Sequence, residues 1–149
     1  MLRAVELKED RMNILHFIMP KAEVAFLNAD STVRQGLEKM LFHGHSAIPV
    51  VDSEGRYEGT VTEGNFLRAL YNDREPDLKR LENIELRSII RRDYKAISAN
   101  ADINEILSNA INQNFVPVVD DRGMFIGIIT RKSIIRYLAT VKTELGEQE

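Results

Sequence analysis

Hydrophobic and polar positions in the first half of the chain predict five regular elements. Apolar residues three or four positions apart share one face of a helix, whereas short runs rich in Val and Ile favour strands. By this rule the order is strand, helix, strand, strand, helix, over residues 24–27, 33–41, 47–51, 57–61 and 66–70. Ser31 or Thr32 can cap the first helix, and His43-Gly44-His45 ends it.

The second half repeats that order. Ala96-Ile97 is the expected first strand, and Asp102 can cap a helix whose apolar face holds Ile103, Ile106, Leu107, Ala110 and Ile111. Two strands, 116–119 and 125–129, flank a turn at 120–123, and a last helix carries Ile134, Ile135, Leu138 and Val141. Each half also begins with an expected lead-in helix, marked by Leu15, Ile18 and Met19 and by Leu86, Ile89 and Ile90.

The two halves are copies of one unit. Residues 48–62 align with residues 116–130 without a gap, and the identical positions are a Pro, a Val-Val-Asp run, two glycines and a Thr. Strand-helix-strand implies a parallel crossover and the hairpin adds an antiparallel neighbour, so each copy has a small mixed sheet. We expect an α+β fold of two β-α-β-β-α repeats, with the first repeat in 1–72, a connector in 73–84 and the second repeat in 85–149. Two such copies, each burying one face against the other, leave clefts where they meet.

Composition and charge exclude several classes of function. The 149 residues contain no cysteine, which excludes disulfides and thiolate chemistry. The net charge is −3 with both signs interspersed, so no broad basic surface for binding nucleic acid is expected. The charged start of the chain does not read as a signal peptide or a membrane span, so we expect a soluble cytoplasmic protein. His43 and His45 lack a third ligand at suitable spacing and read as a polar loop rather than a metal site. Nothing supplies an activated nucleophile or an acid/base pair, so no enzyme activity is expected.

Thr62 and Thr130 end equivalent strands just before a helix. Free N–H groups and the positive helix end favour a hydroxyl or an anion at such a position. Each Thr can serve as a simple helix cap or as part of a binding site. Arg131 and Lys132 follow Thr130, where Glu63 and Gly64 follow Thr62, so the two clefts should differ in charge.

The repeated hydrophobic-Pro-Val-Val-Asp run, glycine turn and Gly-hydrophobic-hydrophobic-Thr segment resemble a tandem pair of CBS domains, named from cystathionine β-synthase. The resemblance extends from about Leu15 to Leu138. It implies sheet-to-sheet packing of the repeats about a pseudo-twofold axis, as a Bateman module, with adenine nucleotides in the clefts between them. Among CBS proteins, the chain is most similar to stand-alone two-repeat sensors of cyclic di-AMP from Gram-positive bacteria.

The resemblance also implies the site residues. A first cleft would hold the ligand among Lys21, Val24, Ala25, Ser46, Ala47, Ile48, Ile128, Thr130, Arg131, Lys132 and Ser133. In that cleft the backbone of Ala25 and Ala47 would read the adenine edge, Ile48 and Ile128 would pack the ring, and Arg131 with Lys132, facing Lys21, would neutralise phosphate. A second, weaker cleft would be formed by Arg92, Lys95, Ala96, Phe115, Val116, Thr62 and Asn65.

One departure from the family bears on the choice of ligand. The family's ribose-binding Asp is replaced by Asn65 in the first repeat and by Ser133 in the second. A cyclic dinucleotide, whose 3′-hydroxyls are esterified, has less need of that carboxylate than free AMP or ATP. We therefore expect a non-catalytic sensor of cyclic di-AMP that regulates an effector protein, needs no cofactor or metal, and forms a homodimer. A sensor of AMP, ATP or S-adenosylmethionine and a ligand-free dimerisation module remain the alternatives.

Overall fold

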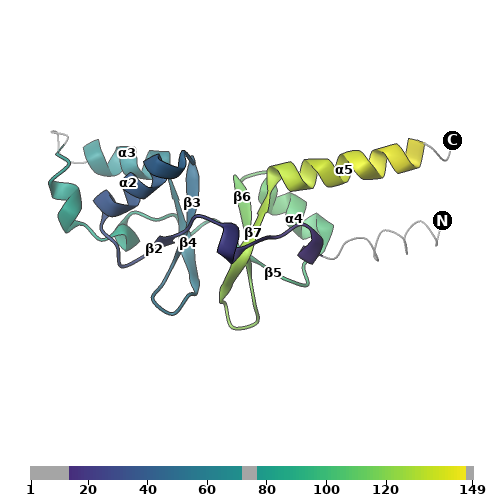
Figure 1. Ribbon diagram of the computed structural model, residues 1–149, viewed down its shortest axis with the longest axis horizontal. Coiled ribbons are helices and arrows are strands. Elements are labelled where there is room, and N and C mark those ends of the chain that lie inside the picture. Colours follow the sequence, from purple (N-terminus) through teal and green to yellow (C-terminus); the bar gives the residue numbers. More distant parts are fainter. Residues whose placement is uncertain (1–13, 72–76, 147–149) are drawn as a thin grey trace.

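The computed structural model describes residues 14–71 and 77–146 and has two halves, each a sheet covered by helices (Figure 1). The strands are β1 (Met19–Pro20), β2 (Leu27–Asn28), β3 (Ala47–Val51), β4 (Tyr57–Thr62), β5 (Ile97–Ser98), β6 (Phe115–Val119) and β7 (Phe125–Thr130). The helices are α2 (Val33–His43), α3 (Glu63–Tyr71), α4 (Ile103–Ala110) and α5 (Arg131–Gly146). Short 3-10 helices are η1 (Ile14–His16), η2 (Lys21–Glu23), η3 (Arg80–Asn83) and η4 (Leu86–Ser88). The two sheets face each other at the centre and the helices lie outside them, which confirms the predicted α+β fold of two repeats.

Strand pairing follows the sequence prediction within each repeat. One sheet has the order β2-β3-β4 and the other the order β1-β7-β6-β5. In both, the first strand of the repeat pairs parallel with the second, and the second pairs antiparallel with the third. The first strands are only two residues long: β2 is shorter than the predicted strand 24–27, and β5 has the predicted length but begins one residue later.

Side chains at the element ends explain why these segments start and stop where they do. Thr32, rather than Ser31, caps α2 and forms a capping box with Gln35, and Gly44 ends the helix in a left-handed conformation. In the turn after β3, the Asp52 carboxylate accepts from the backbone N–H groups of Glu54 and Arg56, each at 2.9 Å. These bonds, the one from Arg56 first, hold the pKa of Asp52 below its usual value.

The turn after β6 is built in the same way. The Asp120 carboxylate accepts from the N–H groups of Arg122 at 2.8 Å and of Met124 at 3.0 Å. The bond from Met124 is the main reason that the pKa of Asp120 is low. The Asp of each Val-Val-Asp run is therefore the side chain that closes its hairpin.

The lead-in segments cross between the repeats, which the sequence did not predict. Ile14, before the first repeat, is 2% exposed and packs in the core of the second repeat with Ile97, Ile106, Val116 and Ile129. Strand β1 then pairs with β7, and the centre of the Phe17 ring lies 4.9 Å from the centre of the Tyr137 ring on α5. The sheet of the second repeat is thus completed by a strand that precedes the first repeat in sequence.

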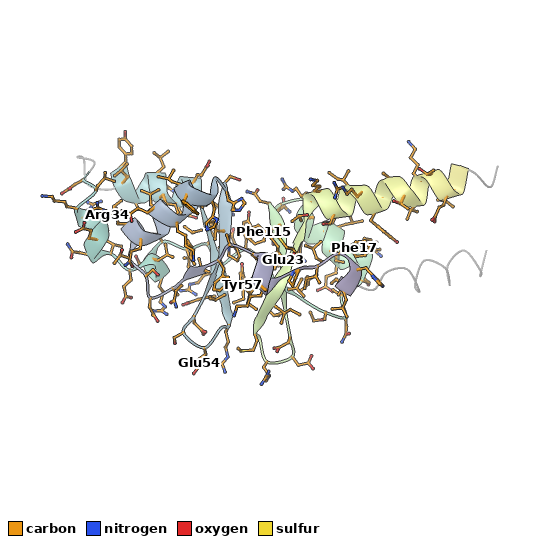
Figure 2. The ribbon with its side chains drawn as sticks, viewed as in Figure 1. Phe17, Glu23, Arg34, Glu54, Tyr57 and Phe115 are labelled. Atoms are coloured by element: carbon orange, nitrogen blue, oxygen red, sulfur yellow. The ribbon has the colours of Figure 1, made fainter. Side chains whose placement is uncertain are left out.

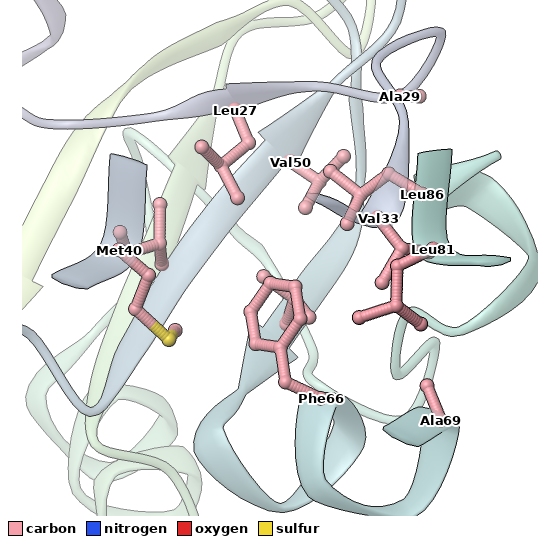
Figure 3. Close-up of a cluster of buried hydrophobic side chains, with 11 residues drawn as sticks. Leu27, Ala29, Val33, Met40, Val50, Phe66, Ala69, Leu81 and Leu86 are labelled. Carbon is pink, nitrogen blue, oxygen red and sulfur yellow. The ribbon is translucent and has the colours of Figure 1, made fainter. Parts of the chain in front are cut away.

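The segment before the second repeat makes the reciprocal crossing. Leu81 and Leu86 are fully buried in the core of the first repeat, beside Val33 and Phe66 (Figure 3). Arg91 then pairs with Thr60 on β4 through N–H···O bonds of 2.9 and 2.7 Å. Residues 73–76 of the expected connector lie outside the described residues, but Leu81, in its later part, belongs to the first repeat's core.

Two glycines of the repeated motif permit this crossing. A Cβ on Gly59 would lie 2.6 Å from the carbonyl oxygen of Arg91, and a Cβ on Gly127 would lie 2.3 Å from that of Met19. Only glycine lets the crossing backbone approach the strand this closely.

Parts of the prediction for individual apolar positions were wrong. The lead-in helix expected through Leu15 and Ile18 is only a three-residue 3-10 helix, with Leu15 59% exposed. Ile111 and Ile135, expected on core faces, are exposed: α4 ends at Ala110, so Ile111 lies just beyond it, and Ile135 lies on the face of α5 that points away from the sheet.

Candidate functional site

The two sheets meet through a cluster of apolar side chains. Its buried members are Val24, Val51, Tyr94, Phe115, Phe125 and Ile128. Figure 2 places Phe115 and Tyr57 between the sheets. Burial raises the pKa of Tyr57, whose hydroxyl bonds Thr60 at 2.8 Å. This apolar seam fixes how the repeats face each other.

Hydrogen bonds join the repeats at both ends of the seam. At the hairpin end, the Phe125 N–H donates to the Gly55 carbonyl at 2.9 Å and the Tyr57 N–H donates to the Gly123 carbonyl at 3.2 Å. At the opposite end, the Asn114 side-chain amide lies 3.3 Å from the Ser46 hydroxyl.

A cavity of about 350 Å³ opens beside the seam in the first repeat. It is lined by Ala22, Glu23, Val24, Ala25, Phe26, Lys39, His43 and His45. The Lys39 ammonium donates to the Phe26 carbonyl at 2.8 Å and lies 5.6 Å from the centre of the Phe26 ring. The His43 and His45 rings are nearly parallel, with centres 6.0 Å apart. Three basic side chains and one carboxylate therefore surround a space large enough for a small ligand.

Ala25 offers an open backbone edge to this cavity. Within residues 14–71 and 77–146, neither its N–H nor its carbonyl forms a hydrogen bond. It lies between η2 and β2, where the backbone has left the helix and not yet entered the sheet. A donor and an acceptor on one residue, both available, can pair with a ligand edge of matching pattern.

The other apolar residues predicted for the first cleft lie in two different places in the structure. Val24 and Ile128 are buried together in the seam, and Ala47 packs beside them. Ile48, expected to pack against a ligand ring, has no exposed surface and lies in the core of the first repeat. That expectation is wrong because side chains alternate along β3, and Ile48 points to the helix-covered face.

The cations expected to face each other are apart. The Arg131 Nε donates to the Ala110 carbonyl at 3.0 Å, and its Nη2 lies 3.4 Å from the Ile111 carbonyl, so the guanidinium caps the end of α4. Lys21 points toward the hairpins instead: its ammonium lies 5.1 Å from the centre of the Phe26 ring, and a Cβ on Gly55 would be 3.5 Å from it. Lys132 is exposed on the first turn of α5.

The two threonines act as helix caps in the structure. The Thr62 hydroxyl and N–H both donate to the Asn65 carboxamide oxygen, at 2.9 and 2.8 Å. The Thr130 hydroxyl lies 2.9 Å from the Ser133 hydroxyl, and the Ser133 backbone N–H donates to the Thr130 hydroxyl oxygen at 3.2 Å. Each threonine is thus partnered three residues later, at the position of the family's Asp.

The predicted second cleft is not assembled as expected. The Arg92 guanidinium donates to the side-chain carboxylate of Glu58 and to the Glu58 backbone carbonyl, each at 3.4 Å. Val116 is fully buried in the core of the second repeat, and Phe115 is buried in the seam. Lys95 is exposed and Ala96 partly buried.

Sequence reasoning missed Lys39 and assigned the two histidines only to a polar loop. Lys39 stands on the polar side of α2, and nothing in its spacing distinguishes it from a solvated lysine. The residues become neighbours because the exit of α2 folds back toward the chain that enters β2. Across residues 14–71 and 77–146, no group of three or more His, Cys, Asp or Glu side chains is placed to hold a metal ion. None of the helices in these ranges combines the length and hydrophobicity that a membrane crossing requires.

Comparison with known proteins identifies the family. The model of the CBS domain matches residues 16–72 and again 86–140. The chain belongs to the CBS domain family. It is 23% identical over 137 residues to cyclic di-AMP receptor B of Bacillus subtilis, covering 90% of this chain and 93% of the relative.

Solved CBS structures share the fold. CbpB in complex with c-di-AMP aligns with a TM-score of 0.83 at 19% identity, covering 100% of both chains. CbpB of Listeria monocytogenes, also in complex with c-di-AMP, aligns with a TM-score of 0.78 at 22% identity, covering 86% of this chain and 96% of the other.

Proposed function

We propose that this CBS protein is a non-catalytic regulatory module that binds cyclic di-AMP, with one adenine seated in the cavity beside Ala25. The observation that carries the proposal is the open N–H and carbonyl of Ala25 at the wall of a cavity rich in basic side chains. Adenine presents an amino donor next to a ring-nitrogen acceptor, which matches that backbone edge. The similarity to cyclic di-AMP receptor B supports the choice of nucleotide.

The surrounding side chains suit the rest of the nucleotide. Phe26 and Val24 offer apolar contact to the base, and Lys39 with His43 and His45 can face a phosphate from the open side of the cavity. Ser46, Ala47, Thr130, Lys132 and Ser133 would form the opposite wall, with Lys21 at the hairpin end. Arg131 would join them only by leaving the α4 carbonyls, so in the free protein its role is structural.

A second copy of the chain and an effector protein complete the proposal. Large apolar side chains are exposed on the outer helices of both repeats and at the end of α4: Leu41, Phe42, Leu67, Tyr71, Ile111, Ile135 and Leu138. Apolar helical faces of this extent favour association, and the homodimer would pair through them. Ligand binding would change how rigidly the two repeats are held against each other, and the effector would bind the free and ligand-bound states with different affinity.

Calorimetry with matched ligands tests the adenine edge. With the ribose and phosphates held in place, guanine presents its acceptor where adenine presents a donor. Cyclic di-GMP should therefore bind at least roughly tenfold more weakly than cyclic di-AMP, since each buried unpaired group costs about 1–3 kcal/mol. AMP serves as the competitor that represents the mononucleotide alternative. Equal binding of the two cyclic dinucleotides, or tighter binding of AMP, would refute the proposed ligand.

A charge variant tests the position of the phosphates. Lys39→Ala should weaken cyclic di-AMP binding roughly tenfold to a hundredfold, because a charge-assisted hydrogen bond contributes about 1.5–3 kcal/mol. Lys142→Ala, on the exposed part of α5, makes the same change in net charge away from the cavity and should bind like the wild type. Equal effects of the two substitutions would show that the ligand lies elsewhere.

A further inference from the structure

The strand register identifies the residues of the second repeat that correspond to the cavity of the first. Leu27 and Ile97 hold equivalent places in the parallel pairs, so Lys95 corresponds to Ala25. Ala47 pairs with Thr62 as Phe115 pairs with Thr130, so Gln113 corresponds to His45. The two sites can therefore be compared residue by residue.

In the second repeat, the backbone edge that is open at Ala25 is already bound. The Lys95 N–H donates to the Gln113 side-chain oxygen at 2.8 Å, and the Gln113 side-chain amino group donates to the Lys95 carbonyl at 3.1 Å. The same amino group lies 3.2 Å from the Phe115 carbonyl. Gln113 is 4% exposed, one of two buried polar residues in the described ranges. The oxygen and the amino group of its carboxamide are thus both hydrogen-bonded within the protein and almost entirely closed off from water.

The carboxamide repeats the hydrogen-bonding pattern of adenine. It offers one acceptor and, beside it, an amino donor, as the base does. We infer that Gln113 is a built-in substitute for the adenine edge, which keeps the second cleft closed to nucleotide and limits the protein to one adenine-reading site per chain. This inference rests on the proposed function for its reading of the Ala25 edge.

Two aromatic residues complete the closure. Tyr94 and Phe115 stand where the first repeat has Val24 and Ala47, and they are 4% and 5% exposed with ring centres 5.5 Å apart. The Tyr94 hydroxyl accepts from the Asn114 N–H at 2.9 Å. Val24 lines the cavity beside Ala25, whereas its counterpart Tyr94 is a buried ring packed with Phe115, so side-chain size acts together with hydrogen bonding to close the second cleft.

Amide hydrogen exchange on the wild-type protein tests the inference without a variant. In the free protein, the Lys95 amide should exchange at least roughly tenfold more slowly than the Ala25 amide, relative to their unstructured rates, because only Lys95 is bonded. Saturating cyclic di-AMP should slow the Ala25 amide and leave the Lys95 amide unchanged. Slowing of both amides by the ligand would overturn the inference.

Variants distinguish the effect of the Gln113 hydrogen bonds from the effect of the space that the Phe115 ring fills. Phe115→Ala makes room beside Lys95 but keeps Gln113, and calorimetry should still give one equivalent of cyclic di-AMP per chain. Gln113→Ala combined with Phe115→Ala removes the hydrogen bonds to the Lys95 backbone and also makes room beside it. This double variant should bind two equivalents of cyclic di-AMP per chain. A second equivalent in Phe115→Ala alone, or only one in the double variant with a freely exchanging Lys95 amide, would refute the role of Gln113.

The outcome also distinguishes this inference from the proposed function. If no adenine nucleotide protects Ala25, the proposed function fails, whatever Lys95 does. If Ala25 is protected but Gln113→Ala leaves the exchange of the Lys95 amide unchanged, only the inference about Gln113 fails. If the double variant does not fold, the exchange experiment on the wild type decides by itself.

Discussion

Substituting Gly59 with alanine tests the crossing of the lead-in segments between repeats. The added Cβ would lie 2.6 Å from the Arg91 carbonyl oxygen and 3.1 Å from Ile90 Cδ1, both inside the 3.4 Å of ordinary contact. The Arg91 backbone must therefore move away from β4. Its two hydrogen bonds with Thr60, at 2.9 and 2.7 Å, are the first interactions to weaken.

The cost follows from those interactions. Two backbone hydrogen bonds contribute about 1–3 kcal/mol together, and forcing extra volume into a packed site typically costs about 1–3 kcal/mol. We expect a loss of about 2–6 kcal/mol in the free energy of unfolding, which for a chain of this length lowers Tm by about 4–24 °C.

Chemical and thermal denaturation measure this loss, with Gly64→Ala as the matched control. A Cβ on Gly64 would find its nearest neighbour, an Arg68 side-chain atom, at 3.4 Å, and alanine is favourable within α3. The control should be as stable as the wild type or slightly more stable. If Gly59→Ala loses less than about 0.5 kcal/mol, a typical surface effect, the close approach of the crossing segment is refuted.

Three further predictions follow from other parts of the molecule. Ile14→Ala removes a side chain buried in the second repeat and should cost about 2–5 kcal/mol in urea denaturation, whereas a loss below about 1 kcal/mol would contradict its core position. Asp120, whose carboxylate pKa is lowered by the N–H of Met124, stabilises the fold above its unfolded pKa of about 3.9, and this contribution is lost as the pH falls through the lower folded value. Denaturation at several pH values should therefore find Asp120→Asn less stable than the wild type at pH 7, with a difference that shrinks below about pH 4; a difference independent of pH would refute this role. Light scattering should give a dimer for the wild type and a monomer for Phe42→Glu, since Phe42 is 86% exposed on α2, and a monomeric wild type would contradict the proposed homodimer.

The hydrophobic pattern predicted most of the regular elements because their information is local. Strands β3, β4, β6 and β7 and helices α2, α3 and α4 lie within a few residues of their expected ranges, and Asp102 caps α4 as predicted. Such elements depend on residues one helical turn or one hairpin apart. Ile111 was misassigned because the apolar spacing continues past Ala110, where the helix ends in the structure.

The candidate site could be predicted only in part. The backbone at Val24 and Ala25 was placed in the cleft by family resemblance, and both residues line the cavity. Arg131 was assigned to phosphate by its charge and its place at a helix start, but the end of α4 lies within its reach. Lys39 was not predicted because the approach of α2 to the chain before β2 depends on packing of the whole repeat.

The sequence by itself determined the duplication, the order of elements in each repeat and the CBS family, because each is encoded in neighbouring residues or in their recurrence. Only the tertiary structure decided that each lead-in segment packs on the other repeat, since Ile14 and Leu86 are apolar in either arrangement and contacts across the chain choose between them. It also decided that the equivalent backbone edges differ. Ala25 is open and Lys95 is bound because the side chain of Gln113 folds back over a residue 18 positions away, a contact that no local pattern records.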